Sequence, residues 1–230
     1  MYNGLIEQFN SKYEEEEKNL LFLYKSKIGI AINSLNKNED VINGVYEYYK
    51  KVLTNPKNMF MNFTVFKDIS LDSLESFRES LETINEKIEP LLSKLEIEEP
   101  ITVYRMISVK KNDKTYFLSK GNIISTSIDI DECLNFCIND NDYNHYLYQI
   151  NLPKNSKVAI CPYTIGVNTN NDQLILTTRK DQKEIILNKE LYDFKHNNES
   201  EIPLSEKTTI KVISLDAKEK INRKQETRKI

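Results

Sequence analysis

Residues 91–106 read Leu-Leu-Ser-Lys-Leu-Glu-Ile-Glu-Glu-Pro-Ile-Thr-Val-Tyr-Arg-Met, and the character of the chain changes in this stretch, at Pro100. Before Pro100, apolar residues recur at intervals of three and four, the spacing of one face of an α-helix. After it come short β-branched or aromatic runs separated by Asn, Asp and Lys, a pattern typical of β-strands. The sequence therefore predicts an α+β protein with a mainly helical half, residues 1–99, and a β-rich half, residues 100–217.

The first half begins with two apolar stripes at helical spacing. They run from Leu5 to Tyr13 and from Leu20 to Ile28, and an acidic run between them, Glu14 to Glu17, is expected to form a solvated helix face. A further helix is predicted over Glu39–Leu53, because the next residues lead into a proline and the residue before a proline is pushed out of the α region.

The last helix before Pro100 has the clearest start signal. Asp72 and Glu75 fit a capping box, and an apolar stripe follows from Leu74 to Leu95. Pro90 lies inside this stripe, so we expect it to kink the helix.

The second half is expected to form eight short strands in an antiparallel sandwich or barrel. One helix, from Asp129 to about Ile138, should interrupt them, because Asp129 and Glu132 again fit a capping box. The mixed-charge tail at 218–230 is expected to fray, so residues 1–217 would form one domain. The predicted strands are Ile101–Met106, Asn122–Ser127, Tyr146–Leu152, Lys157–Cys161, Gln173–Thr178, Glu184–Leu187, Leu191–Phe194 and Thr208–Leu215.

Composition excludes several classes of protein. The 230 residues are 39% hydrophobic and 29% charged, with 32 basic and 35 acidic side chains, which fits neither a disordered chain nor a polycationic nucleic-acid binder. Only five glycines and six prolines are present, so collagen-like and proline-rich scaffolds are excluded as well.

Metal, disulfide and membrane signals are weak. Cys133 and Cys137 are four residues apart, but only Cys161 and two histidines remain to complete a zinc site, so we expect no metal. Three cysteines without a disulfide-like spacing indicate reduced thiols and a reducing compartment. The first residues lack the basic and apolar regions of a signal peptide, and there is no run of eighteen apolar residues. We therefore expect a protein without a membrane span that is cytoplasmic or is delivered into a target cell.

Three short polar motifs stand on predicted strands. Arg105 ends an apolar strand, Ser125-Thr126-Ser127 ends the next one, and Gln182-Lys-Glu184 starts a later one with the amide and the carboxylate on the same side. Taken singly, each motif has an ordinary structural explanation. Arg105 could be an exposed arginine, Ser125-Thr126-Ser127 could cap a strand end, and Gln182 and Glu184 could belong to a half-exposed strand.

In this order the three motifs resemble the Arg, Ser-Thr-Ser and Gln-x-Glu motifs of bacterial mono-ADP-ribosyltransferase exotoxins, in the branch related to the Rho-modifying clostridial exoenzymes. Pro100-Ile-Thr-Val-Tyr-Arg105 looks like that family's first catalytic strand. Ile150-Asn-Leu-Pro-Lys-Asn-Ser-Lys-Val-Ala159 looks like its Pro-Lys-Gly-Ser-Lys turn, with Asn155 in place of glycine. The resemblance covers about Leu81 to Leu215 and implies a helical half packed on an antiparallel β-sandwich of the ADP-ribosyltransferase type.

The resemblance implies a chemistry that suits these residue types. Cleaving NAD between nicotinamide and ribose develops positive charge on the ribose, which a carboxylate such as Glu184 would stabilise. A guanidinium such as Arg105 would grip the pyrophosphate. Ser125 would hold Glu184 or the ribose in register, with Thr126 and Ser127 supporting the pocket wall. Tyr104 and Arg78 are further candidates for NAD contacts, and the aromatics Phe136, Tyr143, His145 and Tyr146 either stack on nicotinamide or pack in the core.

Gln182 is expected to face the acceptor. In the family that is resembled, glutamate at this position goes with arginine acceptors, whereas glutamine goes with asparagine or, in some relatives, with guanine bases. Arg179 stands five residues before Glu184, where Rho-modifying relatives carry an aromatic, and this speaks against recognition of Rho. Gln182 and Arg179 are thus the predicted substrate-recognition residues.

Three functions stay open on the sequence. The first is an NAD-dependent mono-ADP-ribosyltransferase with NAD glycohydrolase side activity, a monomeric toxin or effector that modifies a protein side chain other than arginine. The second is the same catalytic core acting on a guanine base of nucleic acid. The third is a catalytically inactive adaptor of the same fold, which loss of the arginine or the glutamate would indicate, but both residues are present.

Overall fold

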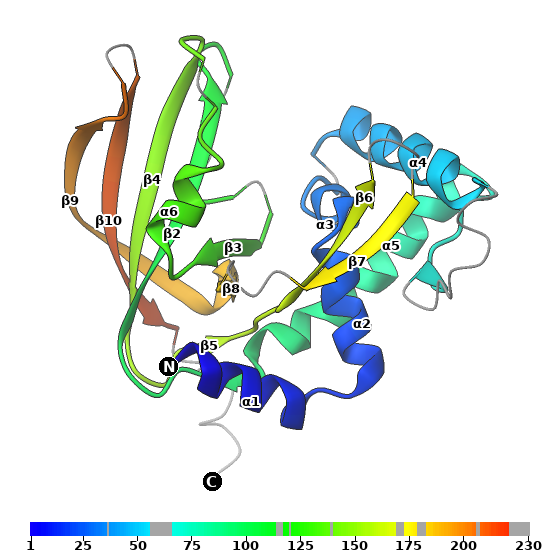
Figure 1. The fold of residues 1–230 in the computed structure, drawn as a ribbon, viewed down its shortest axis with the longest axis horizontal. Helices are drawn as coiled ribbons and strands as arrows, with labels where there is room; N and C mark the ends of the chain where they lie inside the picture. The colour runs from blue at the N-terminus through cyan, green and yellow to red at the C-terminus, as the bar shows by residue number, and fades with distance from the viewer. Residues whose placement is uncertain are drawn as a thin grey trace, which may run out of the picture.

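The computed structural model describes residues 1–35, 37–55, 66–113, 117–119, 121–138, 140–168, 173–178, 183–205 and 208–220, without the side chains of 163–168 and 173–178. Figure 1 shows two parts side by side, a group of helices from the first 90 residues or so and a large twisted sheet from the second half. The helical first half and the β-rich second half predicted from the sequence are therefore both present.

The helical part contains five α-helices and one 3-10 helix among the described residues. The fourth, α4, begins and ends as predicted. The two stripes before it form three helices, because the chain breaks at Lys25 and Ser26 and the Ser26 side chain caps the next helix. The elements are α1 (Tyr2–Lys12), α2 (Glu15–Tyr24), α3 (Lys27–Ile32), α4 (Glu39–Leu53), α5 (Leu74–Ile88) and η3 (Glu89–Ser93).

The structure corrects three details of the helix ends. The capping box of α5 is formed by Ser73 and Ser76, not by Asp72 and Glu75, because the serine hydroxyls at both positions accept from the backbone amides. Pro90 does not kink an α-helix; α5 ends at Ile88 and the chain tightens into η3. Leu95, predicted at the end of the helical stripe, lies in a two-residue strand, β1 (Leu95–Glu96).

The large sheet has six strands in the order β8-β3-β2-β4-β10-β9. All of its pairs are antiparallel except β4 with β10, so the sheet is mixed and mostly antiparallel. Small two-stranded sheets join β1 to β5 and β6 to β7. The strands are β2 (Ile101–Lys110), β3 (Ile123–Ser127), β4 (Tyr143–Leu152), β5 (Lys157–Val158), β6 (Tyr163–Asn168), β7 (Gln173–Thr178), β8 (Glu184–Asn188), β9 (Tyr192–Pro203) and β10 (Thr209–Glu219), with a 3-10 turn η4 (Lys189–Leu191).

Three sequence expectations about the β-rich half need correction. The helix predicted from Asp129 to about Ile138 is shorter, α6 (Ile130–Leu134), and the Asp129 side chain caps it alone, by accepting from the Asp131 amide. Strand β6 was not predicted. Strand β10 continues to Glu219, past the expected boundary at 217, because it pairs with β9 along its whole length. Residues 221–230 lie outside the described residues.

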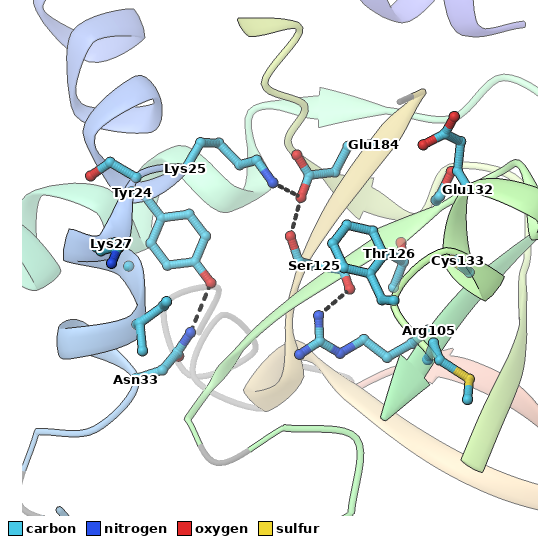
Figure 2. A pocket seen from close by; sticks show the side chains of 16 residues that line it. Tyr24, Lys25, Lys27, Asn33, Arg105, Ser125, Thr126, Glu132, Cys133 and Glu184 are labelled. Carbon is cyan, nitrogen blue, oxygen red and sulfur yellow. Dashed lines mark hydrogen bonds and ion pairs between the residues drawn. The ribbon is translucent and has the colours of Figure 1, made fainter. Parts of the chain in front are cut away.

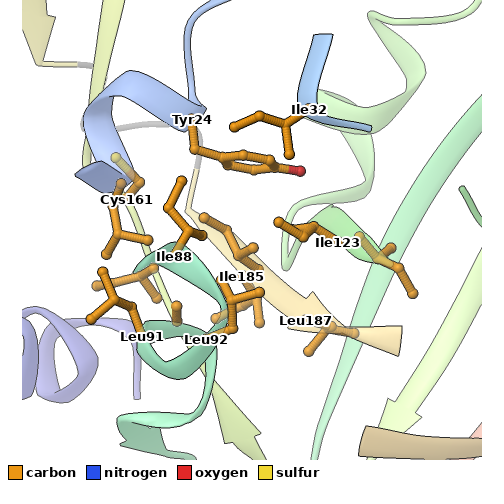
Figure 3. Close-up of a cluster of buried hydrophobic side chains, with 14 of the residues drawn as sticks. Tyr24, Ile32, Ile88, Leu91, Leu92, Ile123, Cys161, Ile185 and Leu187 are labelled. Carbon is orange, nitrogen blue, oxygen red and sulfur yellow. The ribbon is translucent and has the colours of Figure 1, made fainter. Parts of the chain in front are cut away.

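The helical part and the sheet share one hydrophobic core. Figure 3 shows Tyr24 and Ile32 from the helices, with Ile88, Leu91 and Leu92 below them, packed against Ile123 of β3 and Ile185 and Leu187 of β8. All eight side chains are buried. Because the apolar face of β3 and β8 is covered by the helices, the two parts cannot separate without exposing this surface to water.

The close contact between Gly121 and Asn33 limits how closely the two parts of the fold approach each other. Gly121 lies just before β3 and Asn33 ends α3, and a Cβ atom at position 121 would lie 2.1 Å from Asn33 Oδ1 and 3.0 Å from its Cα. Any side chain at 121 would therefore have to displace Asn33, the residue that ends α3. Glycine is required here for space, not for its backbone conformation.

We predict that Gly121→Ala lowers the free energy of unfolding by about 1–3 kcal/mol, the usual effect of overpacking. Gly44→Ala is the matched control. Position 44 lies in the middle of α4 with no atom within 4 Å of its would-be Cβ, so alanine should stabilise the protein by about 0.8–1 kcal/mol. Urea denaturation measures both changes. If the two substitutions changed the free energy of unfolding by the same amount and in the same direction, the close approach of α3 and β3 would be contradicted.

Candidate active site

A cavity of about 500 Å³ opens between the helical part and the sheet. Its walls come from the turn between α2 and α3, from β2 and β3, from α6 and from the first residue of β8 (Figure 2). Its volume is typical of small-molecule sites. The cavity thus lies where the two parts of the fold meet.

Glu184 lies at the base of this cavity and is only 5% exposed. Its Oε1 atom accepts hydrogen bonds from the Ser125 hydroxyl and from Lys25 Nζ, which is 2.5 Å away. Its Oε2 atom is buried and has no hydrogen-bond partner among the described residues. A buried carboxylate with an unfilled oxygen is costly to maintain in a protein interior, which is typical of functional sites rather than of structural ones.

Strand register explains the contact between Ser125 and Glu184. In the β3–β8 pair Ser127 lies opposite Glu184 and Ser125 lies opposite Ile186, so Ser125 and Glu184 are diagonal neighbours on one face. The other two hydroxyls of the motif hold the backbone. Thr126 donates to the Ile185 carbonyl at 2.7 Å, and the Ser127 hydroxyl accepts from the Asp129 amide at 3.0 Å.

Arg105 approaches the cavity from β2. Its Nη1 donates to the Ser125 carbonyl at 2.7 Å and its Nε to the Leu118 carbonyl at 3.3 Å. A guanidinium has five N–H donors, so three have no hydrogen bond to any described residue. Arg105 is therefore fixed by two carbonyl groups and still has donors for an anion.

Two residues beside the site have left-handed backbones. Leu118, with φ of 62°, presents its carbonyl to Arg105, and Lys183, with φ of 36°, precedes Glu184. Residues other than glycine and asparagine rarely adopt this conformation, and such strain gathers at functional sites. The Lys183 carbonyl accepts from the Ile128 amide at 3.2 Å, which ties the start of β8 to the end of β3.

The helical wall of the cavity was not predicted from the sequence. It contains Tyr24, Lys25 and Asn33, whose side chains appear in Figure 2 facing the sheet. Asn33 Nδ2 donates to the Tyr24 hydroxyl at 2.9 Å, and burial raises the pKa of that hydroxyl above its usual value. The only available signal was the polar pair Lys25-Ser26 interrupting two apolar stripes, which marks a helix break but not its position in space.

The third wall comes from α6 and the turn after it, with Glu132, Cys133 and Phe136. Phe136 is 64% exposed, although it lines the cavity. Tyr143, His145 and Tyr146, the other aromatics that follow Ser127, line a different hollow, of about 570 Å³, at the far end of β2 and β4. Of the four aromatics considered from the sequence, Phe136 is thus the one at this cavity.

Two predicted NAD contacts do not line the cavity. Arg78 lies on α5 and pairs with Glu39 at the start of α4, because both face the same inter-helix surface. Tyr104 lies opposite Ser127 in the β2–β3 pair and packs against the small cluster around Met106 and Cys133, but it is not among the residues that line the cavity. Gln182 and Arg179 lie outside the described residues.

The described residues contain no group of three or more His, Cys, Asp or Glu side chains that could hold a metal ion. Within the same residues, no helix is both long and apolar enough to cross a membrane.

Comparison with known proteins places the fold. No protein-family model matches the sequence, and no curated protein is similar to it in sequence. Solved structures do match. Plx2a, an ADP-ribosyltransferase toxin from Paenibacillus larvae, is similar over 94% of this chain and 92% of its own, with 11% identity and a TM-score of 0.50. An ADP-ribosyltransferase from Clostridium botulinum matches over 93% of both chains, with 11% identity and a TM-score of 0.46.

A third match is the enzymatic component of the Clostridium botulinum C2 toxin, with 16% identity and a TM-score of 0.47, over 94% of this chain and 46% of that component. At such low identity the similarity to Plx2a establishes the fold and not the activity. The chain has the α+β fold of bacterial ADP-ribosyltransferase toxins, which confirms the fold that the three motifs implied.

The burial of the three cysteines predicts which thiol reacts first. Burial raises the pKa of the Cys133 thiol to about 11, so at pH 8 this thiol is almost entirely protonated and therefore a poor nucleophile. Cys133 and Cys161 are buried, whereas Cys137 is partly exposed. In the native protein at pH 8, iodoacetamide should therefore modify Cys137 first, as peptide mass spectrometry would detect, and the other two only after unfolding. Early modification of Cys133 would mean that α6 opens.

Proposed function

We propose that this protein is a mono-ADP-ribosyltransferase that cleaves NAD at the nicotinamide–ribose bond and transfers ADP-ribose to a macromolecule. The observation that carries the proposal is the convergence of Arg105, Ser125 and Glu184, from three separate sequence motifs, on one cavity. The fold shared with Plx2a supports it independently. As a protein of this kind it would act as a toxin or effector, with slow NAD hydrolysis as a side activity.

Glu184 has the properties that the cleavage requires. As nicotinamide leaves, positive charge develops on the ribose, and a buried carboxylate stabilises this charge more strongly than a solvated one. The hydrogen bond from Ser125 holds the carboxylate in position, and the strand pair β3–β8 holds Ser125. Small displacements of such a group are costly to the rate.

The residues around the cavity fit the rest of NAD. The three remaining N–H donors of Arg105 suit the pyrophosphate, which offers several anionic oxygens to a planar guanidinium. Phe136 presents an exposed ring at the cavity and is our candidate to stack on nicotinamide. Tyr24 and Asn33 would line the opposite wall.

We infer the acceptor class from Gln182. It precedes Glu184 by only two residues, so Gln182 would meet an acceptor while Glu184 holds the ribose. In the toxin family that the three motifs resemble, glutamine at this position goes with acceptors other than arginine, so a protein side chain other than arginine is the first candidate. A guanine base of nucleic acid is the second candidate, which Arg179 and Lys180 favour by their charge.

The first prediction concerns bond cleavage. Glu184→Gln keeps the size of the side chain but removes its charge, so nicotinamide release from NAD should fall roughly a hundredfold or more. Glu190→Gln is the control, because Glu190 lies on η4 directly after β8 and bonds Asn122 rather than the cavity residues. Near-normal release from the Glu184 variant, measured by chromatography, would remove Glu184 from the catalytic role.

The second prediction separates the acceptor from NAD. Gln182→Ala should abolish labelling of the macromolecular target while NAD hydrolysis persists, because water needs no positioning by the amide. The assay incubates the protein with adenylate-labelled NAD and a cell lysate, and then separates protein from nucleic acid. Label on nucleic acid would favour the guanine acceptor. Equal loss of transfer and hydrolysis would place Gln182 in the NAD pocket, and no nicotinamide release by the wild type would favour an inactive adaptor.

A further inference from the structure

Lys25 is a cavity residue whose contact the proposed reaction does not use. It follows the last residue of α2, in the turn before α3, and its side chain is 16% exposed. Its Nζ atom is 2.5 Å from Glu184 Oε1, which joins the helical part of the protein to the first residue of β8 (Figure 2). The position of Lys25 is well defined, because Gly29 packs its backbone against the Tyr24 carbonyl and leaves no room for a Cβ atom there.

This contact leaves Glu184 without an oxygen that a substrate can reach. Oε1 already accepts from two donors, Ser125 and Lys25, which is the usual capacity of one carboxylate oxygen. Oε2 is buried, with no solvent contact. A ribose hydroxyl that is to donate to Glu184 must therefore replace one of the two donors on Oε1.

Lys25 is the donor that can leave. Ser125 is fixed in β3, which pairs with β8 on one side and β2 on the other, whereas Lys25 has a flexible four-carbon stem at a turn and lines the cavity itself. Lys25 also has a clear function in the protein without NAD. A buried carboxylate without a counter-charge is strongly destabilising, and the ammonium group compensates it.

We propose that Lys25 is an internal competitor of the substrate: it covers Glu184 in the NAD-free protein, and the nicotinamide ribose displaces it when NAD binds. This inference rests on the proposed function. Lys25 is in this account a gating residue, not a catalytic one, because it leaves Glu184 before the bond breaks. The ion pair thus sets the affinity for NAD and not the rate of cleavage in the complex.

The test compares two substitutions in a nicotinamide-release assay. Lys25→Met removes the charge at similar length and should lower KM for NAD roughly tenfold, the scale of one charge-assisted hydrogen bond, with kcat changed less than about twofold. Lys25→Arg keeps the charge and binds a carboxylate more firmly, so it should raise KM. Lys87→Met is the control, because Lys87, on α5, forms an exposed ion pair with Asp68, and neither residue lines the cavity.

Other outcomes overturn the inference. A lower kcat in Lys25→Met at unchanged KM would mean that Lys25 assists cleavage, and a higher KM would mean that it binds NAD. Unchanged constants would mean that Lys25 has no role. In each of these cases the wild type still releases nicotinamide, so the proposed function stands. Absence of release by the wild type would instead contradict the proposed function.

A second measurement covers the case in which Lys25→Met fails to fold. NADH is a suitable probe, because its uncharged dihydronicotinamide is a poor leaving group and the complex persists. In the wild-type protein, the Lys25 ammonium should give a protected nitrogen NMR signal that is lost on saturation with NADH. A signal that survives saturation would show that the ion pair remains closed, and would overturn the displacement.

Discussion

The structure depends on the packing of the helical part against β3 and β8. The same surface that buries the apolar side chains of both parts also forms the cavity, because Tyr24 belongs to the shared core and to the cavity wall. Gly121 allows α3 to approach within contact of β3, and this approach brings the turn at Lys25 over Glu184. A loss of this packing would therefore remove the site and destabilise the fold together.

Charge is arranged unusually at this interface. Glu184 is buried at the start of the otherwise apolar run of β8, and the hydrogen bond from Ser125 of β3 alone does not neutralise it. Burying a carboxylate requires a partner, and Lys25 supplies one from the other part of the protein. Arg105 is held differently, by two backbone carbonyls that orient its guanidinium without neutralising it. At the cavity, the Glu184 carboxylate is thus covered by Lys25, whereas Arg105 keeps N–H donors available, which suits a ligand carrying both anionic oxygens and hydroxyl groups.

The sequence predicted most of the local structure but not the site as a whole. Helix α4 and strand β7 have the predicted bounds, because periodicity and a following proline are local signals. Arg105 and the Ser125–Ser127 motif lie at the cavity, since strand alternation and register are predictable once the strands are known.

Tyr24, Lys25 and Asn33 could not be identified from the sequence, because their role depends on how α2 and α3 pack on a sheet formed by residues about a hundred positions later in the chain. The same limit explains Arg78 and Tyr104, whose residue types suit NAD but which do not line the cavity. The parallel pairing of β10 with β4 is likewise a property of the whole sheet.

The central claim is that NAD binds between the helical part and the sheet, with its nicotinamide ribose on Glu184. The most direct measurement is a crystal structure of the wild-type protein with NADH. In that structure we expect the pyrophosphate within hydrogen-bond distance of Arg105, a ribose hydroxyl on Glu184 Oε1, and Lys25 Nζ moved away from that oxygen. A dinucleotide bound elsewhere, or a ribose remote from Glu184 with the Lys25 ion pair intact, would contradict it.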